Sequence, residues 1–275
     1  MKVSVLNLVP LRHGESFKDA MDAMVRLAKR VEDLGYTRYW IAEHHNMRSI
    51  ASSATQLLIQ HTLANTKKIR VGSGGVMLPN HSPYLIAEQY GTLETLYPNR
   101  VDLGLGRAPG TDVPTAMALR RTKDLKTDFE RDLAELSGYF KGSNYVQAYP
   151  AHGLYLPFYI LGSSTDSAYL AAKLGLPYSF AAHFAPTMME NAIAIYNRYF
   201  QPSATLDKPY VILGVNAILA DTDEEAKRLS TTMIQSFLNI VTSNQKGLMP
   251  PLQSEEAVWR EFIATNKVPH FGPIA

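Results

Sequence analysis

Short apolar segments alternate with segments of helical periodicity along most of the chain, and this alternation limits the possible folds more than any other feature. The first pair shows the pattern: residues 3–9 form an apolar run, and residues 16–34 carry apolar side chains at helical spacing until Gly35, which suits a helix C-cap. Strands are expected at residues 3–9, 38–42, 69–76, 101–105, 158–161, 178–182 and 210–220. Helices are expected at residues 16–34, 53–64, 85–96, in a polar stretch that runs to about 140, and at 166–174, 186–200 and 221–241. Such alternation predicts a mostly parallel α/β sheet, either a closed eightfold (β/α) barrel of the TIM type or an open doubly wound sheet.

The remaining segments bear on domain organisation. The segment at about 141–157 contains glycines and prolines and predicts an excursion inserted before the fifth strand. No internal repeat and no Gly/Ser-rich linker is recognisable, so we expect a single domain over residues 1–275. Residues 254–275 hold one more helical segment, and the eighth strand–helix unit of a barrel is missing from the pattern. A barrel without that unit would leave exposed edges on its first and seventh strands.

The composition argues against several classes of protein. A net charge of +2 is too small to indicate nucleic-acid or anionic-membrane binding. The chain has 0 cysteines, so it can form neither a disulfide nor a thiolate metal site. It shows no signal-peptide pattern and no apolar run long enough for a membrane span. We therefore expect a cytoplasmic protein with neither nucleic acid nor membrane as its partner.

Ligands of parallel α/β proteins bind at the carboxyl ends of the strands, which directs attention to the residues that follow each strand. The second strand ends in Glu43-His44-His45, a set suited to acid–base chemistry or to a metal ion. Because neighbouring residues on a strand point to opposite faces, His44 and His45 do not easily reach one ion, and no metal site is expected. One solvent-facing and one structural histidine is the plain alternative, but the position at a strand end favours catalysis.

Glycines and an arginine follow the third and fourth strands. Gly72-Ser73-Gly74-Gly75 would let a planar ring approach the backbone, or would mark a β-bulge. The loop from Gly104 to Gly110 is a poor dinucleotide-binding loop, since it lacks the acidic partner about 20 residues on and Pro109 removes an N–H donor. Arg107 presents a guanidinium at a strand end, which suits a phosphate group, or else a surface salt bridge.

The fifth strand leads through Gly162 into Ser163-Ser164-Thr165-Asp166-Ser167 and then into a helix. Small hydroxyl side chains and free backbone N–H groups at a helix N-terminus predict an anion site. Plain N-capping by Ser164 or Thr165 is the alternative, and the two functions can coexist because a cap satisfies only one donor.

Together these segments resemble the bacterial luciferase-like flavin monooxygenase family over roughly residues 1–220. The matching residues, in chain order, are Ala42 to His45, Gly72 to Pro79 with His81-Ser82-Pro83 and Ala87-Glu88, Pro98 to Arg107, and Gly162-Ser163-Ser164 with Gly175-Leu176-Pro177. Each motif alone is a weak signal, whereas four of them in the same order make a specific one.

The resemblance implies an eightfold barrel that uses reduced FMN as co-substrate and molecular oxygen to oxygenate a small hydrophobic organic compound. It implies His44 as the catalytic histidine, which would handle protons during oxygen transfer. It also implies a cofactor site near the ends of the second to fifth strands, with Gly74 and Gly75 under the flavin ring, where a cis peptide bond would be plausible. The residues assigned to the cofactor by the resemblance are Glu43, Gly74, Gly75, Arg107, Ser163, Ser164 and Ser167.

Several alternatives stay open at the level of sequence. The same superfamily contains deazaflavin-dependent dehydrogenases, which transfer a hydride and need no oxygen, and a flavin-binding protein without catalysis would fit the missing eighth unit. A nicotinamide-binding open-sheet protein is a further, weaker alternative. A separate flavin reductase would supply the reduced FMN, because no nucleotide-reductase motif is present, and a homodimer is expected from the frequency of such oligomers. Met47, Met77, Tyr84 and Phe184 in the loops would make a substrate pocket apolar.

Overall fold

The structure is a computed structural model, and it describes residues 1–108, 110–120, 126, 128–242 and 247–266. These residues group into two compact units. The first comprises Met1–Val9, Met21–Asn46 and Ser52–Val215, and the second comprises Pro10–Ala20, Met47–Ala51 and Asn216–Ala275. The expected single domain over residues 1–275 stays a prediction. Pro109 and residues 267–275 lie outside the described part of the chain.

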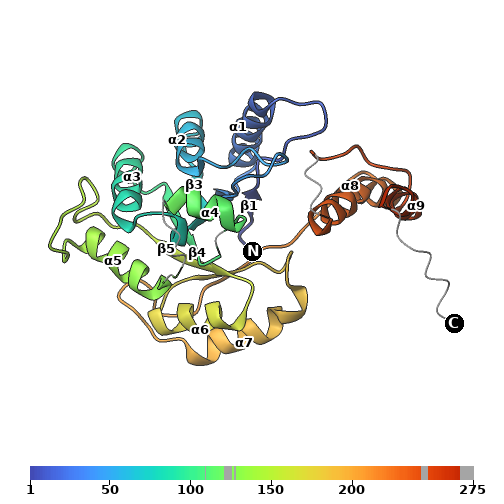
Figure 1. The fold of residues 1–275 in the computed structure, drawn as a ribbon. Helices are drawn as coiled ribbons and strands as arrows, with labels where there is room; N and C mark the ends of the chain where they lie inside the picture. The colour runs from blue at the N-terminus through green and yellow to red at the C-terminus, as the bar shows by residue number, and fades with distance from the viewer. Residues whose placement is uncertain (109, 121–125, 127, 243–246, 267–275) are drawn as a thin grey trace. The chain divides into compact units, whose positions relative to one another are not determined.

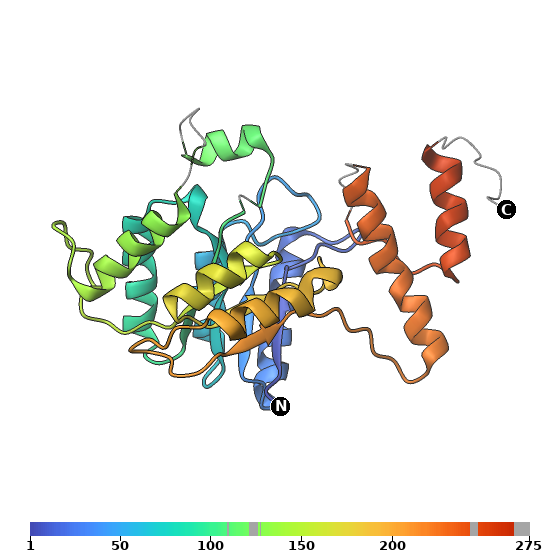
Figure 2. The same cartoon turned by 90° about the horizontal axis from the view of Figure 1, so that it is seen from below.

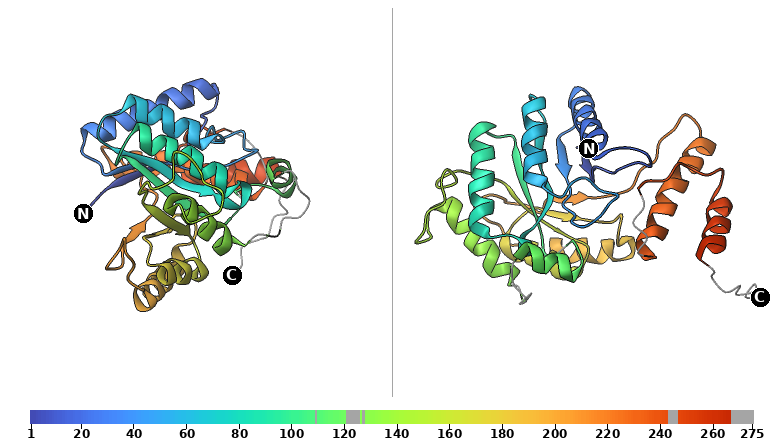
Figure 3. Two further views of the ribbon diagram at one scale, coloured as in Figure 1. Left: turned by 90° about the vertical axis from the view of Figure 1, so that its left-hand side faces the viewer. Right: turned by 45° about the horizontal axis from the view of Figure 1, so that its top comes forward.

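The first unit is built on a seven-stranded parallel sheet whose spatial order follows the chain, β1-β2-β3-β4-β5-β6-β7. The strands are β1 (Ser4–Asn7), β2 (Arg38–Ile41), β3 (Arg70–Met77), β4 (Val101–Gly106), β5 (Phe158–Gly162), β6 (Tyr178–Phe180) and β7 (Val211–Leu213). Sequential order without a reversal is the order of a barrel and not of a doubly wound sheet. The sheet curls into part of a barrel (Figure 3), so the predicted barrel fold is confirmed.

Most helices of the first unit follow a strand and cover the outer side of this sheet (Figure 1). The helices described in the two units together are α1 (Phe17–Asp33), α2 (Thr55–Asn65), α3 (Pro83–Leu96), α4 (Val113–Arg120), α5 (Phe129–Lys141), α6 (Thr165–Leu174), α7 (Met189–Tyr199), α8 (Asp223–Val241) and α9 (Glu255–Asn266), with 3-10 turns η1 (Leu78–Asn80) and η2 (Pro186–Met188). Helix α1 shows why the pattern works: Ala20, Met24, Ala28 and Val31 recur at spacings of three or four and are all buried.

Two sequence expectations need adjustment, and two further segments are as expected. The seventh strand was expected over residues 210–220 but spans only Val211–Leu213, because its backbone hydrogen bonds with β6 and the turn after β6 extend from Tyr210 to Gly214 and no further among the described residues. The polar stretch that runs to about residue 140 contains two helices, α4 and α5, and not one. Residues 142–157 connect α5 to β5 without helix or strand in the described structure. An eighth strand is absent from the described residues.

Side chains on the inner face of the curled sheet meet across it. The Trp40 indole of β2 donates to Asp102 Oδ2 of β4 at 3.0 Å, and its ring packs edge-on against Tyr159 of β5 at 5.0 Å. Strands β2 and β5 are not neighbours in the sheet, so these contacts cross the interior. The buried Asp102 carboxylate also lies 3.1 Å from Arg38 Nε and 2.7 Å from Arg70 Nη2. The interior near the start of β2 is therefore a paired polar layer, and the barrel is packed and not hollow at that level.

Strands β3 and β4 approach each other closely, and glycines make this possible. A Cβ on Gly75 would lie 2.8 Å from the Gly104 carbonyl oxygen, and a Cβ on Gly104 would overlap the Ser73 carbonyl oxygen. The Ser73 hydroxyl fills the remaining space, since it donates to the Gly104 carbonyl at 2.9 Å and accepts from its N–H at 3.1 Å. The register of the β3–β4 pair shifts between Ser73 and Val76. This shift corresponds to the β-bulge that the sequence analysis gave as one interpretation of the glycines.

The second unit contains α8 and α9, which lie side by side (Figure 2). Thr222 caps α8 by accepting from the Glu225 N–H, and three acidic residues follow in the first turn, where the helix dipole favours them. The segment between the helices is held to α8 by Thr231, whose hydroxyl accepts from the Leu252 N–H at 2.9 Å. No helix among the described residues is both long enough and apolar enough to cross a membrane.

Candidate functional site

The loop after β2 carries the predicted catalytic histidine. His44 is partly buried, and its backbone N–H donates to the Ser52 carbonyl at 3.3 Å. Burial lowers the pKa of its imidazole below the ordinary value, although a hydrogen bond with the Gly110 backbone and the charge of Glu43 oppose that effect. The neutral form of His44 therefore dominates at pH 7, which leaves the ring able to accept a proton.

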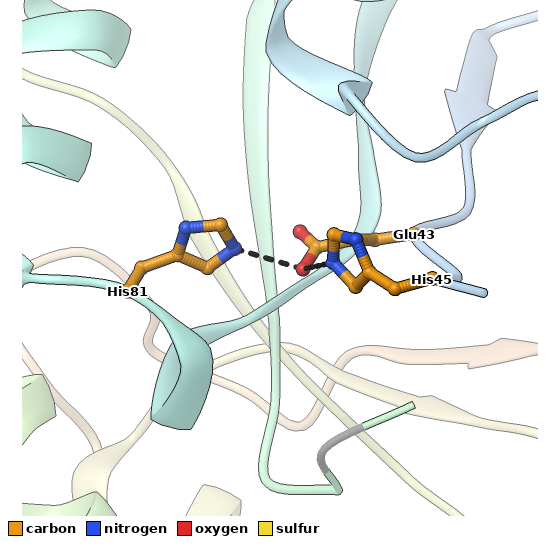
Figure 4. Close-up of side chains that lie close together, drawn as sticks. All are labelled: Glu43, His45 and His81. Atoms are coloured by element: carbon orange, nitrogen blue, oxygen red, sulfur yellow. Dashed lines mark hydrogen bonds and ion pairs between the residues drawn. The ribbon is translucent and has the colours of Figure 1, made fainter. Parts of the chain in front are cut away.

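Glu43, the residue before it, is fully buried and serves as the acceptor of two imidazoles. Its Oε1 lies 2.9 Å from His45 Nε2 and 2.8 Å from His81 Nε2 (Figure 4). Burial alone would raise the pKa of this carboxyl, but the bonds from His45 and His81 outweigh it and hold the pKa below its ordinary value. The second oxygen accepts from the Met77 N–H at 3.4 Å. Both carboxylate oxygens are thus engaged within the protein, and the expected contact of Glu43 with a cofactor stays a prediction.

The two adjacent histidines have different partners. His45 turns to Glu43, whereas His44 bonds with the backbone of Gly110, as expected for neighbours that point to opposite sides. The loop after β4 is bonded to this segment at two more points: the Thr111 hydroxyl donates to the His45 carbonyl at 3.2 Å, and the Asn46 amide donates to Asp112 at 2.7 Å. The loop that begins at Arg107 is thereby held against the segment that carries His44.

Arg107 lines a cleft of about 830 Å³ within the first unit. The cleft is lined by residues of β5 and by the N-terminal turns of α5 and α6: Arg107, Asp128, Phe129, Glu130, Arg131, Ile160, Leu161, Asp166, Ser167 and Leu170. The Arg107 side chain is 56% exposed and pairs with Asp166 at 3.4 Å. A weak and exposed pair of this kind is easily exchanged for a ligand anion. His44 is not among the lining residues, so the cleft and the histidine are two separate parts of the candidate site.

The N-terminus of α6 opens on this cleft. Ser164 is the N-cap residue, but its side chain makes no capping hydrogen bond, so plain capping does not explain the serines. The Ser167 hydroxyl donates to the Ser164 carbonyl at 2.7 Å and lies 3.0 Å from the Tyr178 hydroxyl. Ser163 is exposed. The first-turn N–H groups of α6 and the Ser164 hydroxyl are thus available for an anion, whereas the Ser167 hydroxyl already has partners.

The charges around the cleft fit a phosphate group. Two guanidinium groups, Arg107 and Arg131, line it, together with three carboxylates. Each carboxylate has its own partner: Asp128 accepts from the Arg131 N–H at 3.0 Å, Glu130 lies 2.7 Å from Lys173 Nζ, and Asp166 faces Arg107. Two arginines beside a helix N-terminus form a donor set that suits a phosphate monoester, provided that Asp166 releases Arg107 and that Asp132, 3.4 Å from Arg131 Nη2, gives way in the same manner.

Gly74 and Gly75 occupy the centre of β3, and the peptide bond between them is cis, as the resemblance implied. A Cβ on Gly74 would overlap the Leu6 side chain and approach Trp40 Cβ at 3.1 Å. The neighbouring side chains and strand β4 therefore already account for both glycines, and their expected place under a flavin ring stays a prediction.

Sequence reasoning overlooked two residues that the structure brings to these places. His81 follows η1 and reaches Glu43 across 38 positions of sequence. His81 could have been recognised from its position just after the third strand, within the matched His81-Ser82-Pro83 segment. Arg131 joins Arg107 in the cleft from the first turn of α5. Nothing in its local sequence separates it from a solvent-exposed helical arginine.

Comparison with known proteins identifies the family. Residues 1–270 match the family model described as luciferase-like monooxygenase, and the chain belongs to that family. It is 52% identical over 268 residues to the uncharacterized protein YvbT of Bacillus subtilis (strain 168), a match that covers 94% of this chain and 79% of the relative. It is 49% identical over 260 residues to a luciferase-like monooxygenase of Escherichia coli (strain K12), covering 93% of this chain and 78% of the relative.

Solved structures agree with the fold. The structure of apo-MsnO8 is similar with a TM-score of 0.86 and 34% identity, covering 99% of this chain and 79% of that one. The oxygenating constituent of 3,6-diketocamphane monooxygenase of Pseudomonas putida, solved with FMN, has a TM-score of 0.70 at 17% identity, covering 97% of this chain and 83% of that one. An F420-dependent secondary alcohol dehydrogenase has a TM-score of 0.62 at 15% identity, covering 97% and 82%. At such identities the last two support the barrel fold alone.

Proposed function

We propose that the protein is a flavin-dependent monooxygenase that uses reduced FMN and molecular oxygen to oxygenate a small hydrophobic organic compound. The observation that carries the proposal is the cleft at the ends of β4 and β5, where Arg107, Arg131 and the α6 N-terminus present donors for a phosphate monoester. Membership of the luciferase-like monooxygenase family supports the reaction class. The FMN complex among the structural neighbours supports the choice of flavin.

In this proposal the phosphate end of FMN is held by Arg107 and Arg131, by the free N–H groups of the first turn of α6 and by the Ser164 hydroxyl. Reduced FMN would supply the electrons that activate dioxygen. Asp166 would give up Arg107 to the phosphate, an exchange that costs little because the pair is exposed and 3.4 Å long. Two guanidinium groups and a helix N-terminus favour the dianion over an uncharged end group.

His44 is proposed to hold and move a proton during oxygen transfer. Its lowered pKa keeps the imidazole neutral at pH 7, so that it can accept a proton from the reacting groups and return it. The bonds between the loop after β4 and residues 44–46 keep the ring in place while a ligand enters the cleft. We further propose that a separate reductase supplies the reduced flavin and that the protein is a homodimer.

The test is an anaerobic titration of the protein with FMN, first oxidised and then reduced, followed by flavin fluorescence. Reduced FMN is expected to bind in the micromolar range. Arg107→Ala should weaken this binding by about 1.5–3 kcal/mol, which is roughly 10- to 150-fold in Kd, as expected for the loss of a charged hydrogen bond. Riboflavin, which lacks the phosphate, serves as the matched ligand and should bind wild type and Arg107→Ala alike.

Arg30→Ala, which removes an exposed arginine from the last turn of α1, is the control and should leave Kd unchanged. If Arg107→Ala binds FMN as tightly as wild type, the phosphate lies elsewhere. If FMN fails to bind in either form while a deazaflavin binds, the protein is a dehydrogenase of the same superfamily. Tight binding of reduced FMN without oxygen-dependent turnover across aldehydes, ketones and thioethers would favour a flavin-binding protein without catalysis.

A further inference from the structure

Three side chains of the types that bind transition metals converge beside His44, the proposed catalytic residue. Glu43 and His45 follow β2, and His81 follows β3 through η1, so the group joins the ends of two neighbouring strands (Figure 4). One ligand atom from each residue lies within 4.8 Å of the other two. The separations from Glu43 Oε1 are 2.9 Å to His45 Nε2 and 2.8 Å to His81 Nε2.

We propose that Glu43, His45 and His81 form a binding site for one divalent transition-metal ion, with Zn²⁺ as the best fit. Two imidazoles and one carboxylate are a ligand set that zinc accepts, whereas Mg²⁺ and Ca²⁺ prefer oxygen ligands throughout. Bond lengths of about 2.0–2.2 Å place tetrahedral zinc ligands roughly 3.4 Å apart. Each nitrogen would therefore move about half an ångström away from the oxygen, and the two nitrogens, which lie within 4.8 Å of each other, would settle about 3.4 Å apart around the ion.

In the metal-free protein the same atoms form hydrogen bonds, because each Nε2–H donates to the carboxylate. A bound ion would take both Nε2 lone pairs and Oε1 as ligands, so each imidazole would then hold its single proton on Nδ1. A ring that was neutral would only exchange its Nε2 proton for one on Nδ1 through solvent, whereas a ring that was cationic would release one proton to solvent. The carboxylate keeps its hydrogen bond from the Met77 N–H, which orients it as an outer-shell contact should. Three protein ligands leave one tetrahedral position for water.

The ion can reach the site through its histidine side. The His45 side chain is 11% exposed and the His81 side chain 22%, while Glu43 is wholly covered. None of the three residues lines the cleft proposed for the flavin phosphate, and the ligand set does not use His44. The metal site therefore stands independently of the flavin proposal.

The experiment titrates chelator-treated protein with Zn²⁺ in competition with a chromophoric chelator, and with Co²⁺ followed by its visible absorption. One equivalent of Zn²⁺ is expected to bind with a Kd in the micromolar range or tighter. His45→Ala and His81→Ala should each weaken this binding about 100-fold or more. His44→Ala removes the adjacent imidazole, and His152→Ala removes an exposed one, and both should bind like wild type. Circular dichroism checks that each variant is folded.

X-ray absorption of zinc-loaded wild type covers the case in which a variant fails to fold, and it should show two imidazoles and at least one further oxygen ligand. The proposal is overturned if wild type binds Zn²⁺ no more tightly than about 1 mM. It is equally overturned if folded His45→Ala and His81→Ala keep wild-type affinity, or if the absorption spectrum shows no imidazole. Any of these results would leave Glu43 as a hydrogen-bond acceptor only.

Discussion

Asp102→Ala is expected to destabilise the first unit strongly, because Asp102 is the one carboxylate found in the polar layer inside the described sheet. Its side chain is fully buried, and it pairs with Arg38 at 3.1 Å and Arg70 at 2.7 Å while accepting from the Trp40 indole at 3.0 Å. The Arg38 side chain is only 11% exposed, so it would be left as an uncompensated buried charge. Breaking a buried pair by removing one partner costs about 3–5 kcal/mol, a large part of the roughly 5–15 kcal/mol that stabilises a typical domain.

Urea unfolding followed by tryptophan fluorescence measures this loss, since Trp40 is one of 2 tryptophans and lies in the affected layer. Asp102→Asn keeps an acceptor for the Trp40 indole and should lose less stability than Asp102→Ala. Glu130→Ala is the surface control: its pair with Lys173 is 2.7 Å long but more than half exposed on both sides, so it should cost less than about 1 kcal/mol. Equal unfolding midpoints for Asp102→Ala and Glu130→Ala would refute the argument that the buried ion pairs of Asp102 stabilise the first unit.

Three further outcomes are expected. Gly104→Ala forces a Cβ onto the Ser73 carbonyl and should cost about 1–3 kcal/mol in urea unfolding; a wild-type midpoint would show that β3 can move away. Because the pKa of His44 is lowered in the folded state, the unfolded chain binds a proton first, so stability should fall as the pH drops below about 6.5. His44→Ala should remove that part of the pH dependence in unfolding measured from pH 8 to 5, and an unchanged slope would contradict a depressed pKa. In Gly162→Ala the new methyl group would overlap the Ser167 side chain in the first turn of α6. This variant should raise the Kd for reduced FMN in the fluorescence titration. If the effect acts through the phosphate, the Kd for riboflavin must stay unchanged.

The residue pattern was sufficient for a parallel α/β sheet, and the resemblance to a known family decided between a barrel and an open sheet. Alternation of apolar runs with helical periodicity predicts a parallel sheet because each strand must be covered by the helix that follows it, and this is a local property of the chain. The strand-end rule then singled out His44, Arg107 and the serines before α6 without any coordinates. The length of β7 could not be read in the same way, because it depends on how far the backbone hydrogen bonds with β6 and the turn after it continue, and these end at Gly214.

Only the tertiary structure decided what these residues touch. Glu43 was assigned to a cofactor from its motif, yet its carboxylate faces His45 and His81, the second of which lies 38 positions away in the chain. His44 and His45 turn to different partners, as their alternation along the strand predicts, whereas the contact between His81 and Glu43 has no local signal in the sequence. The alternation of side chains along a strand determines the face of the sheet on which a residue lies. The register between β2 and β3 determines which distant side chain lies next to it on that face.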